Sequence, residues 1–263
     1  MTETQIKFDD GSTYERSVGV WSRLIAEPFL RWLSPAGGKQ WLDVGCGSGV
    51  FSAVVAERAS PGGLHGVDPS ENQLEFARTR LPAPRAEFRQ GDAMALPYPS
   101  DAFDAAVMAL VIAFVPQPAK GVAEMARVVS PGGIVAAYMW DYSGTMPTDP
   151  IPAQAQALGR TYPRPPNTAI AEIGALRALW DAAGLESVET RRFDIARRFA
   201  NFDDFWDTTA MIASVAPMLA GLSDAELAGL KSEVRALVPD DAAGGITRTA
   251  GANAVKGRVK AAT

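Results

Sequence analysis

Gln40-Trp-Leu-Asp-Val-Gly-Cys-Gly-Ser-Gly49 is the stretch that decides the fold, and residues 50–58 follow it directly. A short apolar run that ends in glycine is typical of a buried strand, and residues 50–58 predict a helix. Strand, glycine turn and helix in this order form the first half of a βαβ unit. The stretch therefore predicts a fold in which strands and helices alternate.

The same alternation continues through most of the chain. Five strands separated by helices predict a parallel sheet covered on both faces, that is, a Rossmann-like, doubly wound α/β fold. Ser70 and Gln73 have capping-box spacing at the start of one helix. The expected strands are residues 40–45, 64–67, 86–89, 103–109 and 134–140. The expected helices are residues 18–33 (one or two pieces, because Pro28 limits continuity), 50–58, 71–80 and 118–129, the last one stopped by a turn at 131–133.

The remaining segments are expected to elaborate a single domain of residues 1–263. Residues 144–167 hold six prolines and no clear period, which predicts an irregular insertion near the mouth of a site. Residues 169–183 predict a helix and residues 186–194 a sixth strand. Residues 201–237 predict two or three helices that form a lid, the last one opened by Ser223 and Glu226. Residues 245–259 are expected to form a terminal strand, antiparallel at the sheet edge.

Composition limits the classes of function. The 263 residues are 47% hydrophobic and 21% charged, as in globular proteins. No apolar stretch reaches the roughly 20 residues of a membrane span, and the N-terminus lacks the apolar core of a signal peptide, so a cytoplasmic protein is expected. A net charge of -5 disfavours nucleic acid as a partner. Because Cys46 and His65 are the only cysteine and histidine, no metal site is expected. The oligomeric state is not readable.

The glycine turn is expected to line the ligand site. In an open parallel sheet, ligands bind beyond the carboxyl ends of the strands, where the first strand supplies a glycine turn. Gly45, Gly47 and Gly49 let the backbone approach a ligand, and the helix behind them offers free N–H donors. A dinucleotide fingerprint would need a glycine at position 50, where this chain has Val50. The spacing therefore favours a ligand without a phosphate.

Three acidic residues accompany this turn. Asp68 ends the second strand, where a carboxylate can accept hydrogen bonds from both ribose hydroxyls. Asp92 ends the third strand, where it can accept one from an adenine amine. Asp43 lies inside the first strand and needs a hydrogen-bonding partner if it is buried, either the N–H groups of the turn or a ligand ammonium. Together these positions predict a nucleoside-type ligand.

These motifs resemble those of the class I S-adenosylmethionine (SAM)-dependent methyltransferase family, and within it the ubiquinone/menaquinone-methylase-like branch of small-molecule enzymes. The similarity rests on residues 42–49, 67–70, 91–93, 103–110 and 131–133. It implies SAM as cofactor and S-adenosylhomocysteine as product. It also implies N-terminal contacts, with Arg23 on the methionine carboxylate, although Trp21 in the core and a solvated Arg23 remain the alternative. The cofactor-binding residues implied are Asp43, Gly45, Cys46, Gly47, Gly49, Asp68, Pro69, Ser70, Asp92, Ala93, Met94, Ala109, Leu110, Tyr14, Trp21 and Arg23.

Catalytic residues are less well marked. Many relatives carry a histidine after the fourth strand, but this chain has Val111-Ile-Ala-Phe-Val-Pro116, so no acid–base histidine is expected there. His65, at the start of the second strand, and Cys46 are expected to be structural. Methyl transfer does not need a base when the acceptor is already nucleophilic. The candidates for a base are Asp141, Tyr142 and Tyr14, and the aromatic or sulfur side chains that could line an acceptor pocket are Phe114, Trp140, Tyr142, Phe205, Trp206 and Met211.

The predicted function is methyl transfer to the O, N or C atom of a small-molecule acceptor. No Asn-Pro-Pro-Tyr-type loop follows the fourth strand, which disfavours amide or adenine methylation. Two alternatives remain open: an NAD-dependent oxidoreductase on a similar sheet, and a SAM-binding module without catalysis. The sequence does not identify the acceptor.

Overall fold

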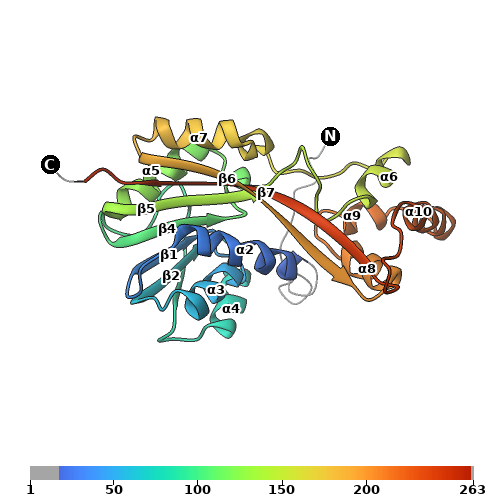
Figure 1. The fold of residues 1–263 in the computed structure, drawn as a ribbon, viewed down its shortest axis with the longest axis horizontal. Helices are drawn as coiled ribbons and strands as arrows, with labels where there is room; N and C mark the ends of the chain where they lie inside the picture. Colours follow the sequence, from blue (N-terminus) through green and yellow to red (C-terminus); the bar gives the residue numbers. More distant parts are fainter. Residues whose placement is uncertain (1–17, 262–263) are drawn as a thin grey trace.

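The computed structural model describes residues 18–261 and has a seven-stranded sheet at its centre (Figure 1). The strand order is β3-β2-β1-β4-β5-β7-β6. The first five strands, all parallel, are β1 (Gln40–Val44), β2 (Gly63–Asp68), β3 (Glu87–Gln90), β4 (Phe103–Ala109) and β5 (Val129–Trp140). The order reverses between β1 and β4, which makes the gap beyond their carboxyl ends the switch point of the sheet.

Helices cover both faces of this sheet. Figure 1 shows α2 (Val20–Leu33), α3 (Val50–Arg58) and α4 (Glu71–Arg80) on one face, and α5 (Pro118–Val128) and α7 (Ile173–Ala182) on the other. Leu42, Val44 and Val107, from the central strands, are fully buried between these layers. The doubly wound α/β fold predicted from the alternation is therefore confirmed.

The last strand does not lie where the sequence analysis placed it. β7 (Ile246–Arg258) is antiparallel, as expected, but it lies between β5 and β6 (Glu186–Phe199), so β6 forms the edge. The burial patterns give the reason. Residues 250–255 of β7 are all buried, whereas β6 is mostly exposed and rich in charge, and charged strands suit an edge.

β6 also runs five residues beyond its predicted end at Asp194. The pairing of β7 with β5 stops at Ala252, which lies opposite Trp140. The last part of β6 pairs with residues 246–251 of β7, which lie beyond that point. The resulting two-stranded ribbon projects past the carboxyl ends of the parallel strands and leads into α8 (Phe202–Ala210), α9 (Ala216–Leu219) and α10 (Asp224–Leu237) (Figure 1). The capping box predicted at Ser223 and Glu226 is present. That these helices act as a lid stays a prediction.

Several local predictions need correction. The insertion 144–167 is only partly irregular, because α6 (Ile151–Ala157) forms within it, with a proline in its first turn. The 3-10 helix η3 (Thr168–Ala171) precedes α7, which is shorter than expected. α2 is one helix despite Pro28, since the buried side chains of Trp21, Ile25 and Phe29 hold both halves against the core. The turn expected at 131–133 is an irregularity within β5.

Candidate functional site

The glycine turn after β1 has a backbone that only glycine adopts readily. Gly45, Gly47 and Gly49 have φ values of 73°, 51° and 78°. A Cβ at Gly45 would lie 2.5 Å from the side chain of Val111, which follows β4, whereas a Cβ at Gly47 would meet nothing nearer than Gln73 Oε1 at 3.8 Å. The turn is thus packed tightly against β4 at one glycine and leaves free space at the next.

Asp68, at the end of β2, is bound to this turn. Its Oδ2 accepts a hydrogen bond from Gly47 N and its Oδ1 one from Ser70 N, both at 2.9 Å. Burial raises the pKa of Asp68, and the two N–H donors partly oppose that shift. A carboxylate has about four acceptor positions, so roughly two remain for a ligand. Asp68 can therefore accept from a pair of neighbouring hydroxyls beside the turn.

Asp43 has a different partner from those expected. Ser52 Oγ, from α3, donates to Asp43 Oδ2 at 2.6 Å, and Asp43 Oδ1 is buried without a hydrogen bond. Burial raises the pKa of Asp43 from its ordinary 3.8 to about 7; the Ser52 hydrogen bond lowers it and the charge of Asp68 raises it. At neutral pH, Asp43 is thus close to half protonated, which eases the burial of its unpaired oxygen.

The end of β3 supplies an accessible acid. Asp92 is exposed, and its Oδ1 accepts from Met94 N at 2.8 Å, which fixes residues 92–94 as a short turn. Ala93 and Met94 are half-buried. Gly91 N donates to the carbonyl oxygen of Asp68, so this turn is tied to the end of β2. Asp92 and Asp68 therefore lie at adjacent strand ends, on the side of the sheet predicted for a nucleoside.

The remaining residues predicted around the turn have mixed environments. Cys46 is buried, and burial raises the pKa of its thiol well above the usual range, in keeping with a packing role. Pro69 and Ser70 lead into α4, where Ser70 Oγ accepts from Gln73 N at 3.4 Å. Ala109 ends β4, and Leu110, which follows it, has a left-handed φ of 64°. A non-glycine residue in that conformation is strained, and such strain gathers at functional sites.

The predicted N-terminal contacts receive less support. Trp21 is buried, with its ring centroid 6.5 Å from that of Phe199. Arg23 donates to Glu57 at 2.5 Å, and Glu57 lies about 10 Å along α3 from the glycine turn. In this structure Arg23 is thus occupied by Glu57, as the solvated alternative would have it, and its contact with a methionine carboxylate stays a prediction. Tyr14 lies outside the described residues.

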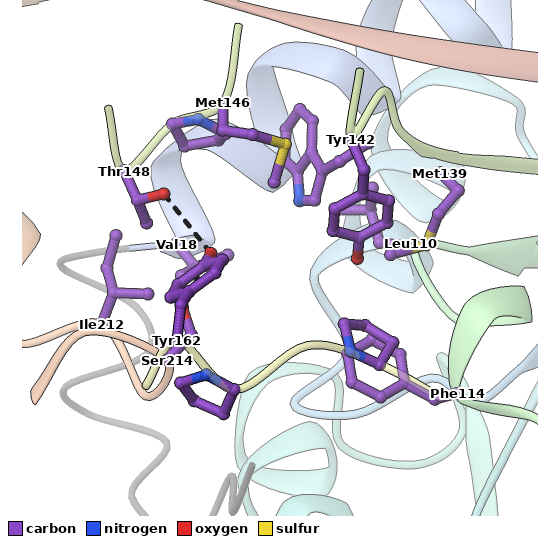
Figure 2. Close-up of a pocket in the computed structure, with 14 residues that line it drawn as sticks. Val18, Leu110, Phe114, Met139, Tyr142, Met146, Thr148, Tyr162, Ile212 and Ser214 are labelled. Atoms are coloured by element: carbon purple, nitrogen blue, oxygen red, sulfur yellow. Dashed lines mark hydrogen bonds between the residues drawn. The ribbon is translucent and has the colours of Figure 1, made fainter. Parts of the chain in front are cut away.

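A pocket opens beside Leu110, between the ends of β4 and β5, the insertion and the segment between α8 and α9 (Figure 2). Most of its lining is apolar or aromatic, as ligand pockets usually are. Among the aromatic and sulfur side chains predicted for such a pocket, Phe114, Trp140 and Tyr142 line it, while Phe205 and Trp206 are buried elsewhere and Met211 is not part of the lining. The lining residues are Val18, Leu110, Phe114, Met139, Trp140, Tyr142, Met146, Pro147, Thr148, Tyr162, Pro163, Pro165, Ile212 and Ser214.

Hydroxyl groups supply much of the polarity of this pocket. Tyr162 Oη lies 3.4 Å from both Thr148 Oγ1 and Ser214 Oγ, so it links the insertion to the segment after α8. Sequence reasoning missed these three residues, because nothing in a proline-rich segment or a short connection marks which side chains face inward. Only the tyrosine in the insertion offered a signal, as an aromatic residue among prolines.

Two of the predicted candidates for a base have unfavourable surroundings. Asp141 is buried, and Arg192 and Ser143 donate to its carboxylate; burial raises its pKa, but these donors together bring the pKa below the usual value. Burial raises the pKa of Tyr142 well above its usual value of 10. Asp141 is thus an occupied carboxylate and Tyr142 a hydrogen-bond donor. His65 lies near the amino end of β2, away from the pocket, and its ring centroid is 5.4 Å from that of Phe103. This packing agrees with the structural role expected for His65.

Among residues 18–261, no three His, Cys, Asp or Glu side chains come together as a metal site would require. Over the same residues, no helix has both the length and the apolar character needed to cross a membrane.

Comparison with known proteins agrees with this geometry. Residues 42–137 match the family model described as a methyltransferase domain. Over 104 residues, the chain is 39% identical to a demethylmenaquinone methyltransferase of Clavibacter sepedonicus, a match that covers 39% of this chain and 42% of that protein. The chain thus matches less than half the length of the curated relatives.

Solved structures resemble the fold over most of the chain. The YcgJ protein of Bacillus subtilis is 18% identical with a TM-score of 0.58, and covers 90% of this chain and 98% of its own. A phosphoethanolamine N-methyltransferase of Haemonchus contortus, solved with S-adenosylhomocysteine and phosphomonomethylethanolamine, is 19% identical with a TM-score of 0.58. The match covers 97% of this chain and 58% of that protein. The resemblance found in the sequence is confirmed over residues 42–137, which match a methyltransferase domain.

Proposed function

We propose that this protein transfers a methyl group from SAM to a small, largely apolar acceptor and releases S-adenosylhomocysteine. The observation that carries the proposal is the placement of Asp68. Its carboxylate is fixed by Gly47 N and Ser70 N at 2.9 Å and keeps acceptor capacity beside a glycine turn that has space at Gly47. That arrangement suits a ribose with two free hydroxyls.

The residues around the turn fit SAM better than a dinucleotide. SAM has a nucleoside but no phosphate, and Val50 stands where a dinucleotide site needs its third glycine. Asp92 is exposed at the next strand end, where it would accept from the adenine amine. When bound, SAM supplies a methyl group on a positively charged sulfur. The chain has to hold the nucleoside, orient the acceptor and exclude water.

The acceptor would enter the pocket beside Leu110. Leu110 follows β4 and lines the pocket, and the next residue, Val111, packs against Gly45 of the glycine turn, which supports placing the two sites side by side. Val18, Phe114, Met139 and other apolar side chains surround the acceptor and keep water away from the methyl group. Ile212 and Ser214 bring the segment after α8 to the pocket, which supports the proposal that residues 201–237 form a lid.

Calorimetric titration with SAM, S-adenosylhomocysteine and NAD tests the cofactor assignment. We expect the first two ligands to bind and NAD not to bind. Binding of NAD without SAM would favour the oxidoreductase alternative. If SAM binds but no acceptor in a broad small-molecule panel yields S-adenosylhomocysteine, the non-catalytic module is the better account.

A further inference from the structure

The mostly apolar lining of the acceptor pocket includes four hydroxyl groups but no residue suited to remove a proton. Among residues 18–261, the side chains that line it include no Asp, Glu, His, Lys or Arg. Its hydroxyls belong to Thr148, Ser214 and two tyrosines, Tyr142 and Tyr162. Figure 2 shows these tyrosines on different walls, with both rings turned toward the cavity. Any proton that the acceptor must lose is therefore not taken by an ordinary base of the lining.

Tyr142 is poised to donate a hydrogen bond. Within the described residues, its hydroxyl makes no hydrogen bond to the protein, whereas Tyr162 Oη is held between Thr148 and Ser214. Burial, together with the neighbouring Tyr162, raises the pKa of Tyr142, so the phenol keeps its proton at any physiological pH. A half-buried donor with no protein partner is well suited to an acceptor atom of a ligand.

A positive charge stands at the edge of the same pocket. Arg164 lies between two lining prolines, Pro163 and Pro165, with its guanidinium 5.9 Å from the centroid of the Tyr162 ring. It is exposed and, among the described residues, forms no ion pair. Tyr142 and Tyr162 line the same pocket, and the charge of Arg164 acts to lower the pKa of Tyr142 against the effect of burial. The same charge favours a negative ligand atom at that place.

We propose that the acceptor binds as an oxyanion, a phenolate or enolate, whose oxygen accepts a hydrogen bond from Tyr142 in the field of Arg164. This inference rests on the proposed methyl transfer and adds the ionisation state of the acceptor. The lining offers no acid to neutralise a cationic amine, whereas donor and positive charge both suit a negative oxygen. Tyr142 and Arg164 would thus select acceptors by acidity as well as by shape.

The chemical step balances without a proton acceptor in the protein. The acceptor loses its proton to solvent on binding. For attack by the oxyanion, an electron pair on oxygen forms the bond to the methyl carbon, and the carbon–sulfur bond breaks with its pair going to sulfur. The charges of oxyanion and sulfonium cancel. For attack by a conjugated ring carbon, the proton on that carbon leaves to water afterwards.

A coloured phenol tests the inference without knowledge of the natural acceptor. The protein is saturated with S-adenosylhomocysteine and titrated with 4-nitrophenol, whose absorbance reports the phenolate fraction at each pH. We expect the pKa of the bound probe to fall by about one unit relative to the free probe. Tyr142→Phe and Arg164→Gln should each remove part of this shift, and Arg164→Lys should retain more of it than Arg164→Gln.

The controls separate this inference from the proposed function. Arg31→Gln makes the same charge change at an exposed site in the last turn of α2, about 20 Å along the helix from Val18, and should leave the shift intact. Failure to bind S-adenosylhomocysteine would overturn the proposed function. If S-adenosylhomocysteine binds but 4-nitrophenol does not bind, binds neutral, or shows a shift insensitive to Tyr142→Phe and Arg164→Gln, the oxyanion inference is wrong.

Discussion

Replacement of Asp68 by alanine tests the core of the cofactor assignment. Of about four acceptor positions on the carboxylate, Gly47 N and Ser70 N use two, and the other two would serve the ribose hydroxyls. Hydrogen bonds to a charged partner contribute roughly 1.5–3 kcal/mol each, but water replaces part of this in the variant. We therefore expect binding of S-adenosylhomocysteine to weaken by about 1–3 kcal/mol, which is about 5- to 150-fold in Kd.

Calorimetry at constant salt and neutral pH measures this change. Glu75→Ala is the matched control, because Glu75 is an exposed acid on α4 and its loss changes the net charge equally. Thermal unfolding without ligand measures how much stability the Asp68→Ala variant loses because the N–H groups of Gly47 and Ser70 no longer have their acceptor. Because burial raises the pKa of Asp68, affinity in the unaltered protein should also decline as acid protonates this group. Equal affinity in the Asp68 and Glu75 variants would refute the ribose assignment.

Three further predictions concern the turn and the network beside it. Burial raises the pKa of Asp43 to about 7, so folding takes up a proton between about pH 4 and pH 7. The free energy of unfolding should therefore decrease by up to roughly 4 kcal/mol as the pH rises through this window. Urea unfolding of Asp43→Asn should show no such dependence on pH. Gly47→Ala and Gly38→Ala both force a side chain into a left-handed φ with free space around it, so each should lose about 1 kcal/mol of stability in thermal unfolding. Calorimetry should show weaker SAM binding for Gly47→Ala alone, and a similar loss in both variants would contradict the placement of the ligand. Arg192→Met leaves the buried Asp141 carboxylate without its ion-pair partner and should cost about 1–3 kcal/mol in denaturant unfolding, whereas no loss would show that Ser143 suffices.

Much of the predicted cofactor site, that is, the glycine turn and the acids at the strand ends, could be predicted from the sequence because its determinants are local. Gly45, Gly47 and Gly49 lie where the turn needs positive φ, and Asp68 and Asp92 follow short segments that the alternation of strands and helices predicts to be strands. In a parallel sheet, consecutive strand ends meet at one edge, so positions far apart in the chain are brought together by a topology that alternation alone predicts. The partner of Asp43 was missed because Ser52 faces it only once α3 packs against β1.

The sequence by itself determined the doubly wound sheet and the glycine turn with its acids, since periodicity and turn chemistry act over a few residues. Tertiary structure decided where β7 inserts, how far the β6–β7 ribbon projects, and that Tyr142, Tyr162, Ser214 and Leu110 share one pocket. These residues come from a strand end, a proline-rich insertion and a connection between helices. Their meeting depends on how the ribbon places α8–α10 above the sheet, and no short-range pattern encodes a contact between segments that meet only through packing.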